Sequence, residues 1–415
     1  MAHGTNKIET MVSAASPDRT RVLEAIRRDG PTSRADLSRS LGLAKPTVSA
    51  LVRELVEAGL VRERGPRSRA RTTVGDRPPR GRGRPPVLLS FNEQSEYVLG
   101  LHIGVGHTTV VLADANGDGV GRRRLPTPIG PAEEVLHAVG AIAREVVVAA
   151  GIARRRLRAA AVCVPGQVDV AAGTCLLAPN LGWRDVPVVG LLGAALGVPV
   201  GIHNTVQAAA VAEHAFGAGR GARTMALVHA GTGVGAAVLQ DGVVFHGSAG
   251  LAGELGHAVM PGLDAACPCG RHGCVETAAS ATAVARSARD AVRTGSPTRM
   301  AGLGDEITAV DVFAAAEAGD TLAQALLGEA GRTLGIAASW LVNIVNPDVL
   351  VLGGGLVGAG AHLVDPFRAA LEAHALSGAL ARMEVRTWSA GPDAKVRGAV
   401  LLALEATGAA SARPR

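Results

Sequence analysis

Aromatic residues are the scarcest class in this chain of 415 residues, in which Phe, Trp and Tyr together make up 2%. Because 47% of the residues are nevertheless hydrophobic, the cores must be built from alanine, valine and leucine. No apolar run reaches the roughly 18 residues that a membrane span needs, so we expect no membrane contact. The first residues lack the apolar stretch of a secretory signal, so we expect a cytoplasmic protein. The length of the chain is enough for two or three domains.

Cysteine is also rare, and three of the five cysteines fall within residues 253–276. Cys267, Cys269 and Cys274 follow His257 in the pattern His-x9-Cys-x-Cys-x4-Cys. Three thiolates and one imidazole form a complete tetrahedral ligand set for zinc, with no position left for a reactive water. A redox pair or incidental cysteines are the alternative, although dithiol motifs usually read Cys-x-x-Cys. We therefore predict a structural zinc site at these four residues.

The same stretch resembles the zinc signature of the ROK family, which contains sugar kinases and transcriptional repressors. The match comprises Gly-Glu-Leu-Gly-His at residues 253–257, the three cysteines and Glu276. In that family the glutamates at the positions of Glu254 and Glu276 contact sugar, and the histidine at the position of His257 ligates zinc. The resemblance covers residues 87–404 approximately and implies an α/β, two-lobed, actin-like ATPase fold of the ribonuclease H-like type, so we assign residues 87–415 to this domain.

Basic residues are concentrated in one segment of the chain. The net charge is +6, but residues 61–90 alone hold nine arginines against two carboxylates. This local excess suggests a polyanionic partner. We assign residues 65–86 as a basic linker rich in Arg, Pro and Gly, which cannot bury a core. Its Gly-Arg-Gly-Arg-Pro sequence resembles an AT-hook, which fits a narrow minor groove. A wing or a solvated linker is an equally good interpretation, and Arg82 and Arg84 are candidate DNA contacts.

The segment before this linker predicts three short helices. Residues 1–15 have no periodicity, and we expect them to be disordered. Helix starts are marked by Pro17, Ser33 and the Lys45-Pro46 pair. In the third helix, apolar residues recur at i, i+3, i+4, i+7 and i+8, the spacing of an amphipathic helix. We therefore assign residues 16–64 as a winged helix-turn-helix domain, which ROK repressors carry at this place. A small helical bundle for protein docking is the alternative.

The third helix is the candidate reader of DNA. In helix-turn-helix domains the last helix lies in the major groove, with its N-terminal residues nearest to the base edges. Its polar face provides the candidate contacts Lys45, Thr47, Ser49 and Arg53. We expect a homodimer or tetramer that binds a pseudo-palindromic operator.

Two positions argue against kinase chemistry. The resemblance matches His102 and the glycine turn after it to the family's Asp-x-Gly-Gly-Thr phosphate motif, so the magnesium-facing aspartate is absent. It also places Thr205 where the family has the catalytic aspartate. A threonine hydroxyl is too weak a base to accept the sugar proton, and losing a general base typically costs on the order of 10²–10⁴ in rate. We predict that the protein is not an enzyme.

Other matching positions divide into a nucleotide side and a sugar side. On the nucleotide side, glycine turns are retained at Gly231, Thr232, Gly233, Gly353 and Gly354. We regard them as vestigial, because tight turns are needed by the fold whether or not nucleotide binds. On the sugar side, the candidate contacts are Gly166, Asn180, Asn204, Thr205, Glu254, His257 and Glu276. The alternative for these polar groups is that they cap helices and orient the zinc ligands.

These features together predict a sugar-responsive DNA-binding regulator, most simply a repressor of carbohydrate uptake or catabolism genes. Its effector would be a sugar or sugar phosphate bound in the cleft. Two alternatives remain open. One is an ATP-dependent sugar kinase of the glucokinase or N-acetylglucosamine kinase type with an appended DNA-binding domain. The other is a regulator whose sugar site is vestigial and whose signal is a protein partner.

Overall fold

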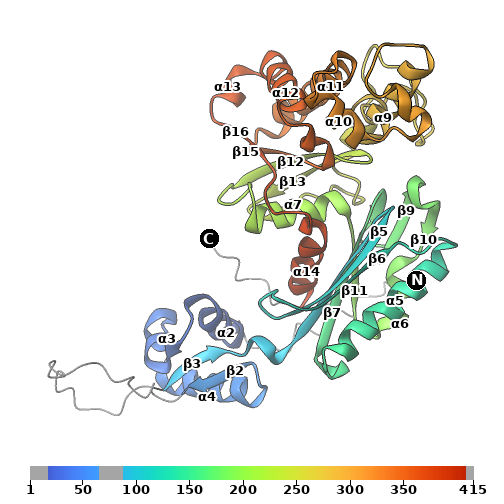
Figure 1. Ribbon diagram of the computed structural model, residues 1–415. Coiled ribbons are helices and arrows are strands. Elements are labelled where there is room, and N and C mark those ends of the chain that lie inside the picture. The colour runs from blue at the N-terminus through green and yellow to red at the C-terminus, as the bar shows by residue number, and fades with distance from the viewer. Residues whose placement is uncertain (1–16, 65–86, 408–415) are drawn as a thin grey trace, which may run out of the picture.

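The structure, a computed structural model, describes residues 17–64 and 87–407. It consists of a small N-terminal domain and two larger α/β lobes (Figure 1). The buried cores consist mainly of Ala, Val and Leu, which confirms the expectation from the scarcity of aromatic residues. Within the two described ranges, no helix has both the length and the apolar composition needed to cross a membrane.

The N-terminal domain contains three helices that begin at the predicted signals: α2 (Pro17–Asp29), α3 (Arg34–Leu41) and α4 (Lys45–Glu57). The Ser33 hydroxyl caps α3 by accepting a backbone N–H of its first turn at 3.2 Å. Gly42 ends that helix with a φ of 67°, a conformation that favours glycine. The inward faces of the three helices form one hydrophobic cluster around Val22, Ile26, Leu37, Val48, Val52 and Leu55.

A three-stranded antiparallel sheet completes this domain: β1 (Thr32–Ser33), β2 (Val61–Arg64) and β3 (Leu88–Phe91), in the order β1-β3-β2. Val61 and Leu89 are both buried against the helices. Residues 88–91 therefore belong to the N-terminal domain, and not to the domain that the sequence predicts from residue 87. The physical reason is that β2 needs a partner strand, which the chain supplies only after residues 65–86. Those connecting residues lie outside the described part.

The first lobe is built on a five-stranded sheet in the order β11-β7-β4-β5-β6. Alternate residues of β4 face opposite sides: Leu99 and Leu101 pack with α5 and α6, whereas Val98 belongs to the cluster that includes the C-terminal helix. A smaller antiparallel sheet, β10-β9-β8, lies at its edge. The elements are β4 (Tyr97–Ile103), β5 (His107–Asp114), β6 (Gly119–Pro126), α5 (Ala132–Ala149), β7 (Leu157–Val164), β8 (Gln167–Asp169), β9 (Thr174–Ala178), β10 (Trp183–Val186), α6 (Val188–Leu196) and β11 (Val200–Asn204).

The second lobe has a five-stranded sheet in the order β14-β13-β12-β15-β16, covered on its outer face by helices (Figure 1). The strands are β12 (Thr224–Ala230), β13 (Val234–Gln240), β14 (Val243–Val244), β15 (Val349–Gly353) and β16 (Glu384–Thr387). The helices are α8 (Glu276–Ala279), α9 (Ala281–Arg293), α10 (Ala309–Glu317), α11 (Thr321–Val345), α12 (Ala361–His374) and α13 (Ser377–Leu380).

Two helices, α7 (Thr205–Phe216) and α14 (Ala394–Ala406), lie between the two sheets (Figure 1). A single hydrophobic cluster joins them to the inner faces of both sheets. The helices approach each other closely, because any side chain at Gly398 would collide with the backbone of Ala208. The last helix, α14, packs on the first lobe, where it contacts β4 and β7.

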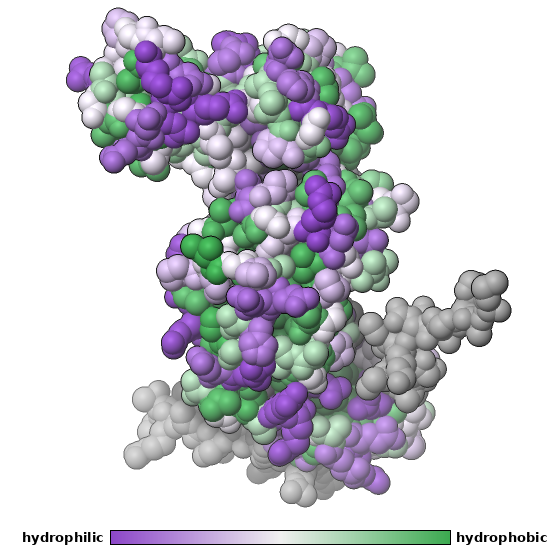
Figure 2. Space-filling view, turned by 90° about the vertical axis from the view of Figure 1, so that its right-hand side faces the viewer, coloured by the Kyte–Doolittle hydropathy of each residue, from purple (hydrophilic) through white to green (hydrophobic). Residues whose placement is uncertain are grey.

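One face of the molecule shows no large hydrophobic patch (Figure 2). On the face shown in Figure 2, hydrophobic residues form small groups between hydrophilic ones and no single continuous patch. Isolated exposed hydrophobic residues are normal on protein surfaces.

Candidate functional site

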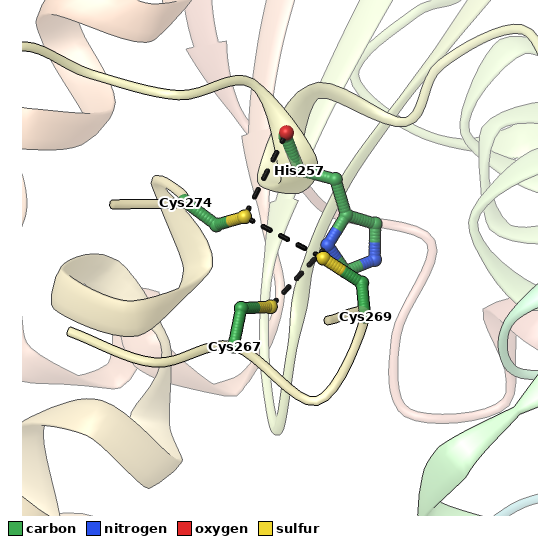
Figure 3. Close-up of side chains that lie close together, drawn as sticks. All are labelled: His257, Cys267, Cys269 and Cys274. Carbon is green, nitrogen blue, oxygen red and sulfur yellow. Dashed lines mark hydrogen bonds between the residues drawn. The ribbon is translucent and has the colours of Figure 1, made fainter. Parts of the chain in front are cut away.

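The four predicted metal ligands come together in one small group (Figure 3). Their ligand atoms all lie within 4.8 Å of one another. His257 Nδ1 is 3.6 Å from Cys267 Sγ, and Cys269 Sγ is 3.7 Å from Cys274 Sγ. Cys267 and Cys274 are buried, whereas Cys269 is partly exposed. This cluster could hold a single metal ion.

Short backbone turns bring the ligands together. His257 ends a 3₁₀ helix, and a β-bridge between Val259 and Cys274 folds the cysteine loop back towards it. Gly270 and Gly273 have φ angles of 89° and 73°, a region that residues with a side chain rarely adopt. The two glycines therefore allow the loop to reverse within a few residues.

His257 stands between the metal cluster and the cleft. Its Nδ1 faces Cys267, and its Nε2 lies 3.7 Å from Oε2 of Glu254. Burial raises the pKa of Glu254; His257 opposes this effect and Glu276 adds to it. A histidine that faces a metal with one nitrogen and a carboxylate with the other has a fixed ring orientation. The cluster thus places an imidazole next to Glu254.

Glu276, just after the cysteines, joins the metal loop to the second glycine turn. Its Oε2 accepts the backbone N–H of Val234 at 2.8 Å. A side chain at Gly233 would displace this carboxylate, so the glycine lets Glu276 reach the turn. The Gly231 N–H donates to the Gly233 carbonyl at 2.9 Å, which closes the turn on itself.

A cavity of about 410 Å³ lies between the lobes. It is lined by residues of both lobes and contains every predicted sugar contact: Gly166, Asn180, Asn204, Thr205, Glu254, His257 and Glu276. The structure therefore brings the predicted set into one site. Carboxylates, amides and hydroxyls gathered in a concave site are the groups that hold a polyol.

Asn204 is engaged by the protein through both ends of its amide. Its Oδ1 accepts the N–H of Val206 at 2.6 Å and caps α7, and its Nδ2 donates to the Gly166 carbonyl at 2.6 Å. This is the helix-capping role that the sequence left open for the polar groups. Gly166 has a φ of 90°, and a side chain there would collide with the backbone of Leu177. Thr205, the next residue along, is buried and lines the cavity.

The predicted glycine turns differ in their relation to the cavity. Thr232 and Gly233 line it, whereas Gly353 and Gly354 are not among the described residues that do. Gly354 has a φ of 99°, and a side chain there would collide with the backbone of Ala230. Packing alone therefore explains this glycine, in line with the interpretation of a turn that the fold requires.

The cavity contains no aspartate among its described lining residues. Burial, and after it the charge of Lys395, lowers the pKa of His102 to about 3, so this imidazole is uncharged at neutral pH. Neither a neutral imidazole nor the Thr205 hydroxyl supplies the negative charge that a magnesium ion and a catalytic base require. The carboxylates of the cavity, Glu254 and Glu276, lie beside the metal cluster.

Three further lining residues were not predicted from the sequence: His107, His229 and Lys395. His229 stands two residues before Gly231, just as His102 precedes its own glycine turn. This repeated His-x-Gly spacing could have identified His229 as a cleft residue. Lys395 has no motif around it that points to the cleft.

Helix α4 presents the predicted DNA contacts on its outer face. Lys45, Thr47 and Arg53 are exposed and Ser49 is half-buried, while the apolar residues between them face the core. The helix is therefore amphipathic in the predicted sense. The other two predicted contacts, Arg82 and Arg84, lie outside the described residues.

Comparison with known families matches both parts of the chain. The model of the ROK family matches residues 98–406, and that of the MarR family matches residues 16–71. The xylose repressor of Caldicellulosiruptor bescii is 31% identical over 336 residues, which cover 80% of this chain and 81% of that protein. A glucokinase of Halalkalibacterium halodurans is 40% identical over 238 residues, 56% of this chain and 72% of that protein.

Solved structures likewise include a regulator that matches most of this chain and a glucokinase that matches a smaller part of it. A ROK family transcriptional regulator, described as a homologue of the Escherichia coli Mlc protein, superposes with a TM-score of 0.79 at 28% identity. That match covers 95% of this chain and 96% of the other. A ROK family glucokinase from Streptomyces griseus, solved with glucose and AMPPNP, has a TM-score of 0.65 at 28% identity and covers 74% of this chain and 99% of its own.

The regulator and the xylose repressor thus match over a larger share of this chain than the two glucokinases do. The resemblance drawn from the metal loop is confirmed by the family match. The chain belongs to the ROK family, and it carries a MarR-type winged helix-turn-helix domain before the family's kinase-like fold.

Proposed function

We propose that this protein is a DNA-binding transcriptional repressor whose effector is a sugar or sugar phosphate bound between the two lobes. The observation that carries this proposal is a cleft with polar groups at the sugar end and no aspartate among its described lining residues. Such a cleft can bind a polyol but lacks the carboxylates of phosphoryl transfer. Repressors among its relatives match about four fifths of this chain.

The DNA reader in this proposal is α4. Its exposed residues Lys45, Thr47 and Arg53 would contact bases or phosphates in the major groove, with Ser49 beside them. Arg82 and Arg84 would add contacts from the basic segment. A homodimer or a tetramer would place two such helices on a pseudo-palindromic operator.

The metal in this proposal is a structural zinc ion. Tetrahedral zinc has bonds of about 2.3 Å to sulfur and 2.0–2.1 Å to nitrogen, which place two sulfur ligands about 3.8 Å apart and a nitrogen and a sulfur about 3.6 Å apart. The corresponding distances are 3.7 Å and 3.6 Å. His257, Cys267, Cys269 and Cys274 would hold the ion, and the ion would keep the loop folded.

Sugar recognition would depend on the groups that the metal loop fixes. Glu254 and Glu276 would accept hydrogen bonds from sugar hydroxyls, and Asn180, which is exposed at the cavity, would add an amide. The amide of Asn204 already serves α7 and Gly166, so its part would be to shape the site. Thr205 would offer a hydroxyl where a kinase needs a base.

The signal would pass through the short connection between β3 and β4. The Asn92 N–H donates to the Leu60 carbonyl at 2.8 Å, and its side-chain amide donates to the Gly59 carbonyl at 2.7 Å. One residue later, the Glu93 carbonyl accepts the Ala115 N–H at 3.1 Å. The connection is thus bonded to both domains. A ligand would shift the DNA-binding geometry only through its different affinity for open and closed lobes.

A sugar kinase with an added DNA-binding domain is the second candidate, because a glucokinase is 40% identical over 238 residues of this chain. Purified protein that phosphorylates glucose, N-acetylglucosamine or mannose at enzyme-like rates would establish it. The cleft argues against this outcome, because His102 and Thr205 replace both functional carboxylates.

The direct test selects genomic DNA fragments on the full-length protein, sequences them, and then titrates the recovered operator complex with a sugar panel. We expect a specific palindrome and its release by one sugar or sugar phosphate. Melting temperature is followed in parallel, because a ligand of the folded state must raise it. Failure to retain duplex DNA at modest salt would reject the proposal. If DNA binds but no sugar stabilises the protein, a protein signal becomes the better explanation.

A further inference from the structure

The cavity end away from the metal cluster contains a cation without a protein anion. Lys395, in the first turn of α14, lines this end together with His102, His107 and His229. Among the described residues, no carboxylate forms an ion pair with its ammonium. Burial lowers the pKa of Lys395, which is the cost of holding a charge away from water.

The groups around Lys395 do not satisfy it. The Cys163 thiol favours its charge, but burial raises the pKa of that thiol to about 12, so the thiol is not an anion at neutral pH. The two cavity carboxylates have other partners: Glu254 faces His257, and Glu276 accepts the Val234 N–H. A partly buried ammonium that opens onto a cavity is expected to have an anionic partner.

Two neutral imidazoles flank this cation. Burial, followed by the charge of Lys395, lowers the pKa values of both His102 and His229 to about 3. Each ring packs against the glycine turn that follows it: the His102 ring against Gly104, and the His229 ring against Gly231. The rings are therefore held in place as neutral hydrogen-bonding groups beside the lysine.

The backbone dipole next to Lys395 also favours an anion. Lys395 lies at the N-terminus of a 13-residue helix, where the aligned peptide dipoles favour an anion. The Gly104 turn also lines the cavity, where the absence of a side chain leaves room for a ligand. With no aspartate among the described lining residues, nothing at this end is suited to magnesium.

We propose that Lys395, with His102 and His229, forms a metal-independent binding subsite for a phosphate monoester, so that the effector is a phosphorylated sugar. Its hydroxyls would lie towards Glu254 and Asn180. The inference rests on the proposed function for the sugar end, but the phosphate subsite can be tested by itself.

The first test is calorimetric titration of the full-length protein in buffer without added divalent cation. Glucose, N-acetylglucosamine and mannose are compared with their 6-phosphates, and inorganic phosphate is included. For one pair we expect the phosphate to bind about 10- to 100-fold tighter, as one charge-assisted contact provides. Lys395→Met should abolish this advantage and leave the affinity for the neutral sugar unchanged. Arg397→Met, which removes the other cation of α14, is the matched control and should retain the advantage.

The second test uses the chain's low lysine content, since only three of its 42 basic residues are lysines. Amine-reactive labelling of the wild-type protein, read by mass spectrometry, should show Lys395 protected by the phosphorylated sugar. The exposed Lys45 serves as internal reference and should label equally with and without ligand. This measurement does not depend on how the Lys395→Met variant folds.

The outcomes separate the subsite from the proposed function. A phosphate advantage that survives Lys395→Met, or that requires added Mg²⁺, would overturn the subsite. Unchanged labelling of Lys395 in the presence of phosphorylated sugar would do the same. If a neutral sugar releases operator DNA and phosphorylated sugars bind no better, the regulator stands and the subsite falls. If Lys395-dependent phosphate binding occurs but no ligand affects DNA, the subsite stands and the sugar-responsive repressor falls.

Discussion

Replacement of Cys269 by serine is the sharpest test of the metal loop. Cys269 is the partly exposed ligand, so the substitution should cost little packing and any large effect should come from the metal. A ligand of the folded state adds about 2.7 kcal/mol of stability when its free concentration is 100 times its dissociation constant. For a domain of this size, each kcal/mol corresponds to roughly 2–4 °C in Tm. We therefore expect a Tm loss of roughly 5–10 °C.

The same substitution should impair ligand response, because the loop carries Glu254 at one end and Glu276 at the other. Metal content per chain, Tm and the effector concentration that releases operator DNA are measured on one preparation. His272→Ala controls for changes to the loop, since His272 is exposed and lies outside the cluster. Cys175→Ala controls for loss of a thiol elsewhere in the chain. One bound zinc per chain in Cys269→Ser, with normal effector response, would refute the assigned site.

Three further predictions concern other parts of the molecule. Arg53→Ala should weaken operator binding about equally in the presence and absence of effector and leave sugar affinity intact. Arg220→Ala is the control. Unchanged operator affinity in Arg53→Ala would show that Arg53 does not contact the operator. Thr205→Asp should not create kinase activity in a coupled assay, because the imidazole of His102 still cannot replace a magnesium-binding carboxylate. Rapid turnover would show that magnesium binding does not depend on a carboxylate at His102. Gly398→Ala should lower the urea unfolding free energy by about 1–3 kcal/mol through overpacking, whereas Gly193→Ala, which has open space around it, should not.

Local patterns predicted much of the molecule. The bounds of the long helix α11, 321–345, coincide with local signals, because Asp320 caps its start and Asn346 ends it in the left-handed conformation. The metal cluster was also predictable, because its four ligands lie within 18 residues and tight glycine turns leave them few arrangements. Helix starts at Ser33 and Lys45 followed from capping chemistry in the same way.

Contacts between distant parts of the chain could not be predicted. The pairing of β3 with β2 depends on strands separated by residues 65–86, and nothing local in Leu88–Phe91 identifies its partner. Lys395 meets His102 and His229 only because α14 packs between the two sheets. The engagement of Asn204 with Gly166 likewise follows from the adjacency of β7 and β11. Sequence spacing contains no information on any of these three.

The position of α14 also constrains how the protein can be synthesised. The strands of the first lobe have all been translated by residue 204, yet one face of that sheet is covered by a helix that begins at residue 394. Nascent chains fold from the N-terminus as ribosomes release them, so this apolar face must wait for almost the entire polypeptide. The N-terminal domain, whose last strand ends at Phe91, can fold early. The N-terminal domain would then be complete well before this face of the first lobe is covered.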